Sequence, residues 1–246
     1  MKNVTGGGVK WLDVPAERFP GWIASFAVRH GDPVAAPGPG QVTFTAPDGE
    51  TAQCRPPFAE SFRLPPALEA DPALAGLVAA VAAHAAAPRT VGVLLARLGG
   101  YAAGVFTGYP PALADAKTGS RPVHGRSAAG GWSQQRFARR RDKQAGEALR
   151  AAADTAVLVF ARWQAHGPAL DAVVLGGDKR AVAGLRDDPR LAPYLALATE
   201  RFSTVPDPRR SVLEAAPAQF TAVRIKLSPP LGGHLRLTRD HFRGSA

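Results

Sequence analysis

Residues 90–107 read TVGVLLARLGGYAAGVFT. Two apolar runs, Thr90–Leu98 and Tyr101–Thr107, are joined in this stretch by Gly99-Gly100. Glycine readily adopts the positive φ angles that two-residue hairpin turns require, so a glycine pair between two apolar runs is a strong hairpin signal. We therefore expect residues 90–107 to form a β-hairpin.

The sequence after this hairpin alternates between strand and helix patterns. Residues 111–130 are rich in Gly, Ser, Pro and basic residues, which favours a third strand that continues into a loop. Between Ser133 and His166, apolar residues recur at helical spacing, and Gly167-Pro168 ends the pattern. We then expect strands at 172–178 and 202–205, helices at 179–185, 191–198 and 208–216, and an irregular tail. This order predicts an α/β fold class.

The run Gly176-Gly177-Asp178-Lys179 follows the expected strand at 172–178 and superficially suggests a phosphate-binding loop. It lacks the glycine spacing of a P-loop. We therefore interpret it as the turn between a strand and a helix.

The sequence before the hairpin has weaker signals. Residues 16–29 are amphipathic at helical spacing, residues 33–39 form a proline-rich loop, and residues 42–45 and 51–55 read as two strands. A helix is expected from Pro72 to Ala87, with Asp71 as its N-cap. We expect a small α+β N-terminal region at residues 1–88, and a domain at residues 89–246 with a glycine-rich loop at 117–133.

Charge is concentrated in one part of the chain. The whole chain carries a net charge of +10, and nine basic but only two acidic residues lie between Lys117 and Arg150. A concentrated basic patch is the electrostatic signature of a protein that binds nucleic acid.

Composition excludes several classes of protein. Cys54 is the only cysteine, so an intrachain disulfide and a Cys-rich metal site are excluded. The six histidines show no metal-binding spacing. The segment Met1–Trp22 has no signal-peptide pattern, and the apolar stretch Leu74–Ala87 is too short to span a bilayer. We expect a cytoplasmic protein that uses neither a metal nor an organic cofactor and does not enter a membrane.

The junction between the basic loop and the long helix holds the most specific motif. Residues 130–141 read GGWSQQRFARRR. Two glycines allow a backbone to approach a ligand closely, and glutamine offers a neutral donor and acceptor at one tip. The arginines supply a fixed positive charge that suits phosphate. Hydrolysis of an ester at an RNA end is one of the few chemistries that need this combination.

This motif resembles that of eukaryotic and archaeal class I release factors, in which Gly-Gly-Gln is followed by Ser-Ala-x-Arg-Phe-x-Arg-x-Arg. The matching positions are Gly130, Gly131, Ser133, Arg136, Phe137, Arg139 and Arg141. Trp132 stands where those release factors have glutamine. The displaced pattern Gly-x-x-Gln, from Gly131 to Gln134, is similar to that of the Vms-like release factor (VLRF) family, and to its actinobacterial branch in particular.

The resemblance implies an RNase H-like α/β domain, as in the central domain of the release factors. It implies a peptidyl-tRNA hydrolase, a carboxylic ester hydrolase that cleaves the ester between a nascent peptide and tRNA on a stalled large ribosomal subunit. The role would be in ribosome quality control. The expected partners are the rRNA of the large subunit and peptidyl-tRNA, and we expect the protein to act as a monomer.

The resemblance also assigns roles to residues. The expected catalytic residues are Gln134, Gly130, Gly131, Ser133 and Gln135. Gln134 would orient the attacking water or stabilise charge on the ester oxygen, because a neutral amide is no general base. Gln135 is the alternative working amide. The expected RNA-binding residues are Trp132, Arg126, Arg136, Arg139, Arg140, Arg141 and Lys143.

Two other functions remain open at the level of sequence. A non-catalytic factor that binds rRNA or tRNA would need the same basic patch. A nuclease that acts on tRNA ends would need clustered carboxylates, and Asp115, Asp154 and Asp171 form no convincing cluster.

Overall fold

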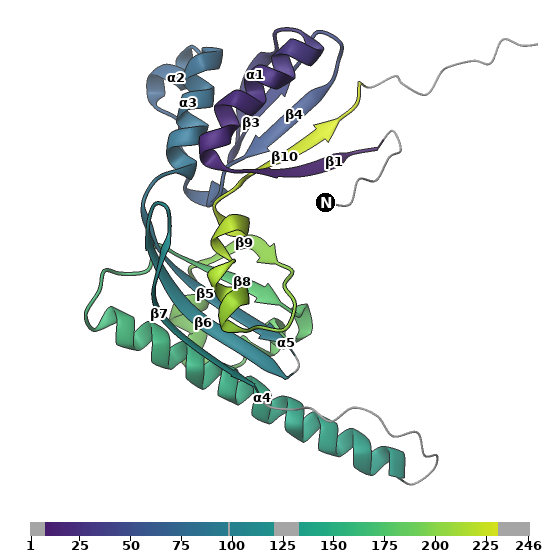
Figure 1. The fold of residues 1–246 in the computed structure, drawn as a ribbon, viewed down its shortest axis with the longest axis vertical. Coiled ribbons are helices and arrows are strands. Elements are labelled where there is room, and N and C mark those ends of the chain that lie inside the picture. The colour runs from purple at the N-terminus through teal and green to yellow at the C-terminus, as the bar shows by residue number, and fades with distance from the viewer. Residues whose placement is uncertain (1–7, 98, 121–132, 231–246) are drawn as a thin grey trace, which may run out of the picture. The chain divides into compact units, whose positions relative to one another are not determined.

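A computed structural model describes residues 8–97, 99–120 and 133–230 of the chain. Its contacts divide the chain into two compact units (Figure 1). Residues 83–222 form the central unit. The described residues before 83 and after 222 form the N-terminal unit.

The central unit is built on one mixed sheet. Its strands are β5 (Arg89–Arg97), β6 (Gly100–Gly108), β7 (Ala112–Ser120), β8 (Ala172–Gly177) and β9 (Ala198–Ser203). They lie in the order β7-β6-β5-β8-β9. β6 is antiparallel to β5 and β7, whereas β8 is parallel to β5 and β9. The expected hairpin and third strand are confirmed, and the order and directions are those of the RNase H-like fold.

Helices of the central unit follow the predicted order. They are α4 (Ser133–Gln164), α5 (Lys179–Leu185), η3 (Pro189–Leu191), α6 (Ala192–Leu195), α7 (Arg210–Glu214) and α8 (Pro217–Phe220). The predicted long helix and the helix at 179–185 are confirmed. β9 begins four residues earlier than the strand predicted at 202–205, and α8 lies in the segment predicted to be irregular.

The long helix α4 packs against the sheet through its C-terminal half. Phe160 is fully buried, and its ring lies over Gly92 of β5, where a Cβ atom would meet the phenyl ring at 3.1 Å. The ring centroid of Tyr194 lies 5.0 Å away. Because β5 offers no side chain at Gly92, the helix can approach the sheet closely at this point.

The turn between β8 and α5 is the predicted strand-to-helix turn. Gly177 has a φ of +109°, which side chains on L residues rarely adopt. Asp178 is the N-cap of α5, and its Oδ1 accepts hydrogen bonds from the backbone N–H groups of Arg180 and Ala181 at 2.8 and 3.1 Å. The cap fixes the start of the helix directly after the strand.

The N-terminal unit contains a second sheet, with every neighbouring pair antiparallel. Its strands are β1 (Lys10–Val14), β2 (Val34–Gly38), β3 (Gln41–Thr45), β4 (Thr51–Arg55) and β10 (Val223–Ser228), in the order β1-β10-β4-β3-β2. Its helical segments are η1 (Ala16–Arg18), α1 (Phe19–His30), η2 (Ala59–Ser61), α2 (Pro66–Ala70) and α3 (Leu74–Ala85). The strands predicted at 42–45 and 51–55 and the helix at 16–29 are confirmed.

β10 differs most from the sequence-based expectation. Residues 223–228 were expected in an irregular tail of a domain at 89–246, and they instead form a strand between β1 and β4. Buried Val223 and Ile225 alternate with partly exposed Arg224 and Lys226, which suits a sheet with one core face. That alternation is a local signal, whereas the distant partners that complete the strand are not visible in the local sequence.

Two further predictions in the N-terminal unit are wrong. The proline-rich segment predicted as a loop contains β2, an edge strand, and edge strands tolerate a residue such as Pro37. Asp71 is not the N-cap of the next helix, because it directly follows α2 and α3 starts only at Leu74. Among the described helices, none combines the length and apolarity needed to cross a bilayer.

Candidate active site

The predicted catalytic glutamines lie at the very start of α4. Ser133 is its first residue, and Gln134 and Gln135 follow within its first turn. Arg126, Gly130, Gly131 and Trp132, which we also predicted to belong to the site, lie outside the described residues.

The start of α4 offers a favourable environment for negative charge. The first four backbone N–H groups of an α-helix lack acceptors within the helix, and the aligned peptide dipoles add partial positive charge there. The first turn of α4 contains no acidic residue that would neutralise this charge. The backbone N–H donors at the start of this 32-residue helix therefore lie in the same turn as Gln134 and Gln135, the predicted catalytic residues.

Four of the five predicted RNA-binding residues of α4 follow a helical repeat, and Arg141 falls outside it. Arg136, Arg139, Arg140 and Lys143 stand at positions i, i+3, i+4 and i+7, which share one side of an α-helix. The repeat continues to Arg150, a basic residue that we did not single out from the sequence.

Burial shows which way this side of the helix faces. Lys143, Glu147 and Arg150 are all exposed, whereas Ala148 and Ala152 are buried. The basic side of α4 therefore faces away from the sheet at these positions. In Figure 1 the first turns of α4 also extend beyond the strands, so the start of the helix projects from the central unit.

The other end of α4 is tied to the sheet and to the following loop. Arg162 forms a bidentate ion pair with Asp115 of β7, and this hydrogen bonding raises the pKa of the Arg162 guanidinium. The indole Nε1 of Trp163 donates a 2.9 Å hydrogen bond to the carbonyl oxygen of Pro168. These contacts anchor the helix at the end opposite Gln134.

The three aspartates considered for a nuclease site take part in separate interactions. Asp115 binds Arg162, and Asp154 binds Arg190 at 2.8 Å. Asp171 accepts a 2.7 Å hydrogen bond from the backbone N–H of Thr90. Among the described residues, no group of three or more His, Cys, Asp or Glu side chains is arranged to hold a metal ion.

Cys54 is buried in the N-terminal sheet. Burial raises the pKa of its thiol, because the surrounding apolar side chains disfavour the charged thiolate. Cysteine attacks as a thiolate, so this position does not suit a nucleophile.

A pocket of about 410 Å³ lies at the end of β7, where the chain enters the basic loop. The residues that line it include Thr118, Ser120, Arg209 and Arg210. Arg210 also binds Glu214 at 2.8 Å, and Asp207 adds a carboxylate to the same lining. Sequence reasoning did not predict this pocket, because residues 118–120 and 207–210 are about ninety positions apart in the chain and come together only in the folded sheet.

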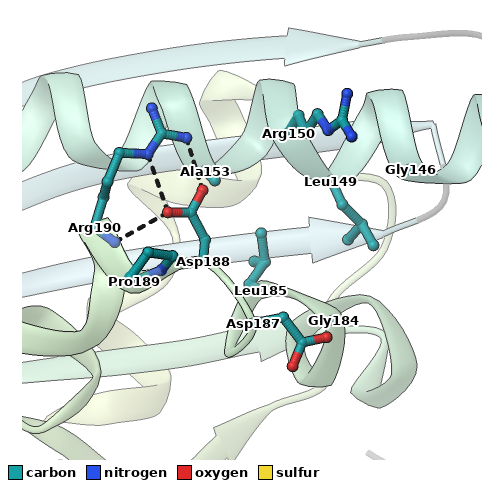
Figure 2. A pocket seen from close by; sticks show the side chains of 10 residues that line it. All are labelled: Gly146, Leu149, Arg150, Ala153, Gly184, Leu185, Asp187, Asp188, Pro189 and Arg190. Atoms are coloured by element: carbon teal, nitrogen blue, oxygen red, sulfur yellow. Dashed lines mark hydrogen bonds and ion pairs between the residues drawn. The ribbon is translucent and has the colours of Figure 1, made fainter.

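A second pocket, of about 480 Å³, lies between α4 and the end of α5 with the segment that follows it. Figure 2 shows Leu149 and Leu185 in its lining, with the Asp188–Arg190 ion pair at one side. The ion pair raises the pKa of Arg190. The ten residues that line this pocket place no nucleophile beside a general base, so they form no hydrolytic site of their own.

Comparison with known families identifies a family to which the chain is similar. The profile of the family described as "Actinobacteria/chloroflexi VLRF1 release factor" matches residues 89–226, which is more than half of the chain. The match includes the motif at residues 130–141 and all of α4. No curated protein matches the chain.

Comparison with solved structures returns archaeal proteins at low overall similarity. The archaeal translation termination factor aRF1 is 12% identical, with a TM-score of 0.34, over 87% of this chain and 67% of its own. Pelota from Archaeoglobus fulgidus is 12% identical, with a TM-score of 0.28, over 86% and 62%. A further archaeal protein is 12% identical, with a TM-score of 0.33, and the chain spans about half of it, 52%.

Proposed function

Since this chain belongs to the Actinobacteria/chloroflexi VLRF1 release factor family, we propose that it is a peptidyl-tRNA hydrolase. It cleaves the ester bond between a nascent peptide and the terminal adenosine of tRNA. The substrate is held on a stalled large ribosomal subunit in the cytoplasm, where a monomer of the protein acts in ribosome quality control.

The observation that carries the proposal is the position of Gln134, the second residue of α4. Its amide can orient a water molecule towards the ester carbon and donate a hydrogen bond to the oxygen on which charge develops. The backbone N–H groups of the first turn, which have no acceptor within the helix, stabilise the same developing charge. The oxygen of the water bonds to the ester carbon, the bond from that carbon to the 3′ oxygen of the adenosine breaks, and a proton of the water ends on that 3′ oxygen, so no side chain of the protein has to keep it.

The basic side of α4 serves to dock the protein on RNA. Lys143 and Arg150 are exposed on this side, and Arg136, Arg139 and Arg140 continue the same repeat towards Gln134. Guanidinium groups bind phosphate oxygens in a bidentate manner, which fixes position and orientation along an RNA backbone. Docking along the helix therefore sets where its first turn lies on the substrate.

The test compares the wild-type protein with Gln134→Ala and Gln135→Ala on large subunits that carry a labelled peptidyl-tRNA. Gel electrophoresis separates free peptide from tRNA-linked peptide. Loss of one preorganised donor typically reduces the rate of such a reaction about 100- to 1,000-fold. We expect this loss for Gln134→Ala and near wild-type release for Gln135→Ala, with unchanged co-sedimentation of all three proteins with the subunits.

Other outcomes separate the alternative functions. If the wild-type protein binds the subunits but releases no peptide, the protein is a non-catalytic RNA-binding factor. If sequencing of the tRNA 3′ end shows that the tRNA itself is shortened, the activity is that of a nuclease. If Gln135→Ala loses activity and Gln134→Ala does not, Gln135 is the working amide.

A further inference from the structure

The N-terminal sheet has one buried face and one polar face. The side chains of Val42, Phe44, Ala52, Cys54 and Ile225 are fully buried and alternate along their strands with partly exposed residues. Helix α1 covers the buried face, as the ring pair between Phe19 of α1 and Phe44 of β3 shows (6.4 Å between centroids). Directly opposite residues in neighbouring strands point to the same face, so the strand registers define the other face completely.

The central row of this polar face crosses all five strands and ends at exposed Ala36 of β2, which is opposite Thr43. Its other four residues come from β1, β10, β4 and β3. Trp11 of β1 is opposite Lys226 of β10, Lys226 is opposite Gln53 of β4, and Gln53 is opposite Thr43 of β3. Neighbouring strands are about 4.8 Å apart, so these four side chains form a continuous band. Trp11 is 59% exposed, although tryptophan is a residue that folded proteins usually bury to a large extent.

The adjacent row adds positive charge. Arg224 is opposite Arg55, and Asp13 is opposite Arg224 and binds its Nε at 3.2 Å. Arg224 is thus paired within this face, and Lys226 of the central row is the cation on which the charge argument rests. Among the described residues, Lys226 has no acidic partner that would neutralise it.

We propose that this polar face, with Trp11 at its edge and Lys226 beside it on the next strand, binds single-stranded RNA. An exposed aromatic ring beside cations on an open sheet provides the two interactions that such binding uses, namely base stacking and contact with backbone phosphates. Gln53 and Thr43 continue the band with neutral hydrogen-bonding groups that suit base edges or ribose hydroxyls.

Charge favours RNA over the other possible occupants of this face. A second copy of the chain would place the same cations opposite one another, and like charges that face each other are unfavourable. The exposed apolar residues of this face lie at its two opposite edges, Trp11 on β1 and Val34 and Ala36 on β2, with polar side chains between them. They therefore form no continuous apolar area of the kind that a protein partner would be expected to meet. The surface is independent of the chemistry at Gln134, because it lies on strands of the other unit and needs no hydrolysis.

The test uses the full-length chain with Arg136→Ala, Arg139→Ala and Arg140→Ala as a common parent, so that binding to α4 does not hide the sheet. The probe is a fluorescein-labelled oligouridylate of about 12 nucleotides, long enough to cover one such surface. Fluorescence anisotropy measures its affinity, and inorganic polyphosphate serves as a probe that has charge but no bases.

Trp11→Ala should weaken oligouridylate binding about tenfold, the loss expected for one stacked base, and should leave polyphosphate binding unchanged. Trp11→Phe keeps an aromatic face and should restore most of the affinity. Lys226→Ala should weaken both probes and lower the salt dependence of oligouridylate binding by about 0.7 in the logarithmic slope. The matched control is Arg29→Ala, which removes one exposed charge from α1, on the other side of the sheet.

Photocrosslinking locates the bound RNA directly. An oligonucleotide that contains 4-thiouridine should crosslink to the tryptic peptide 11–18, which begins with Trp11. Unchanged affinity in Trp11→Ala, or equal losses in Trp11→Ala and Arg29→Ala, would overturn the proposal, as would crosslinks confined to α4. Loss of co-sedimentation with ribosomal subunits in Trp11→Ala at unchanged oligouridylate affinity would instead identify a protein partner.

Discussion

Truncation of Phe160 to alanine tests how α4 is held on the sheet. Phe160 is fully buried, its ring lies over Gly92, and its centroid is 5.0 Å from that of Tyr194. Truncation of a buried phenylalanine to alanine costs about 3–5 kcal/mol, since the transfer free energy of the ring is lost and a cavity remains. The lost ring pair contributes about 0.5–1.5 kcal/mol of this.

The structure places the expected cost in the upper part of that range. The residue beneath the ring is a glycine, which has no side chain that can move into the space, so the cavity stays largely open. We therefore expect Phe160→Ala to lower the free energy of unfolding by about 4–5 kcal/mol. Domains of this size are stable by about 5–15 kcal/mol, so the variant should lose at least about a quarter of its free energy of unfolding.

Urea unfolding followed by circular dichroism measures this change, with Leu158→Ala as the matched control. Leu158 lies two residues earlier on α4 and is 44% exposed, so its truncation should cost less than about 1 kcal/mol. A cost below about 1 kcal/mol for Phe160→Ala, or equal costs for the two variants, would refute the packing described for α4.

A second variant tests the same contact from the sheet side. A Cβ atom at Gly92 would meet the Phe160 ring and the Leu170 Cδ1 at 3.1 Å, so Gly92→Ala alone should destabilise the protein by about 1–3 kcal/mol through overpacking. In the Phe160→Ala background the new methyl group enters the cavity, and the combined cost should be clearly less than the sum of the two single costs. Additive costs would show that the two residues do not share this space.

Two further predictions concern Gly177 and Cys54. Gly177→Ala should lower the free energy of unfolding by about 3 kcal/mol or more, because φ at this position is +109° and a Cβ atom would overlap the carbonyl oxygen of Ala96. Gly146→Ala should instead stabilise α4 by about 0.5–1 kcal/mol, because alanine favours a helix interior over glycine and the added Cβ would meet nothing within 4 Å. Thermal unfolding measures both variants, and equal effects would contradict this geometry. Burial raises the pKa of Cys54, so the folded state keeps the thiol proton that the unfolded chain loses above about pH 8.5. The stability that this proton contributes is fully present below about pH 8.5 and is lost as the pH rises further. Above about pH 8.5 the free energy of unfolding of the wild type should therefore fall by about 1.4 kcal/mol per pH unit relative to that of Cys54→Ala. Parallel pH profiles of the two proteins would show that the Cys54 thiol is not shielded from solvent.

The predictions that succeeded depend on short-range patterns. The glycine pair between two apolar runs is a signal within eighteen residues, and β5 and β6 form the expected hairpin. The apolar repeat of α4 and the Asp178 cap of α5 are also contained within a few turns of helix. The family motif is local too, which is why the sequence pointed to the start of α4 as the site. Whether Gln134 performs the chemistry remains a prediction.

The parts that failed depend on distant partners. Residues 223–228 have a clear alternation of apolar and basic residues, but their neighbours in the sheet lie at 10–14 and 51–55, and no local feature names those partners. The prolines of residues 33–39 argued for a loop, whereas an edge position in the sheet accommodates them.

Local spacing thus determined the hairpin, the long helix and the motif that begins it, because turns, caps and helical repeats are encoded within a few residues. Tertiary structure decided which side of α4 faces solvent, since the burial of Ala148 and Ala152 against the sheet leaves Lys143 and Arg150 on the exposed side. It also decided that Trp11 stands beside Lys226, two residues separated by most of the chain. Cross-strand pairing is a long-range choice made by the burial of a common core face, and only the folded sheet reveals it.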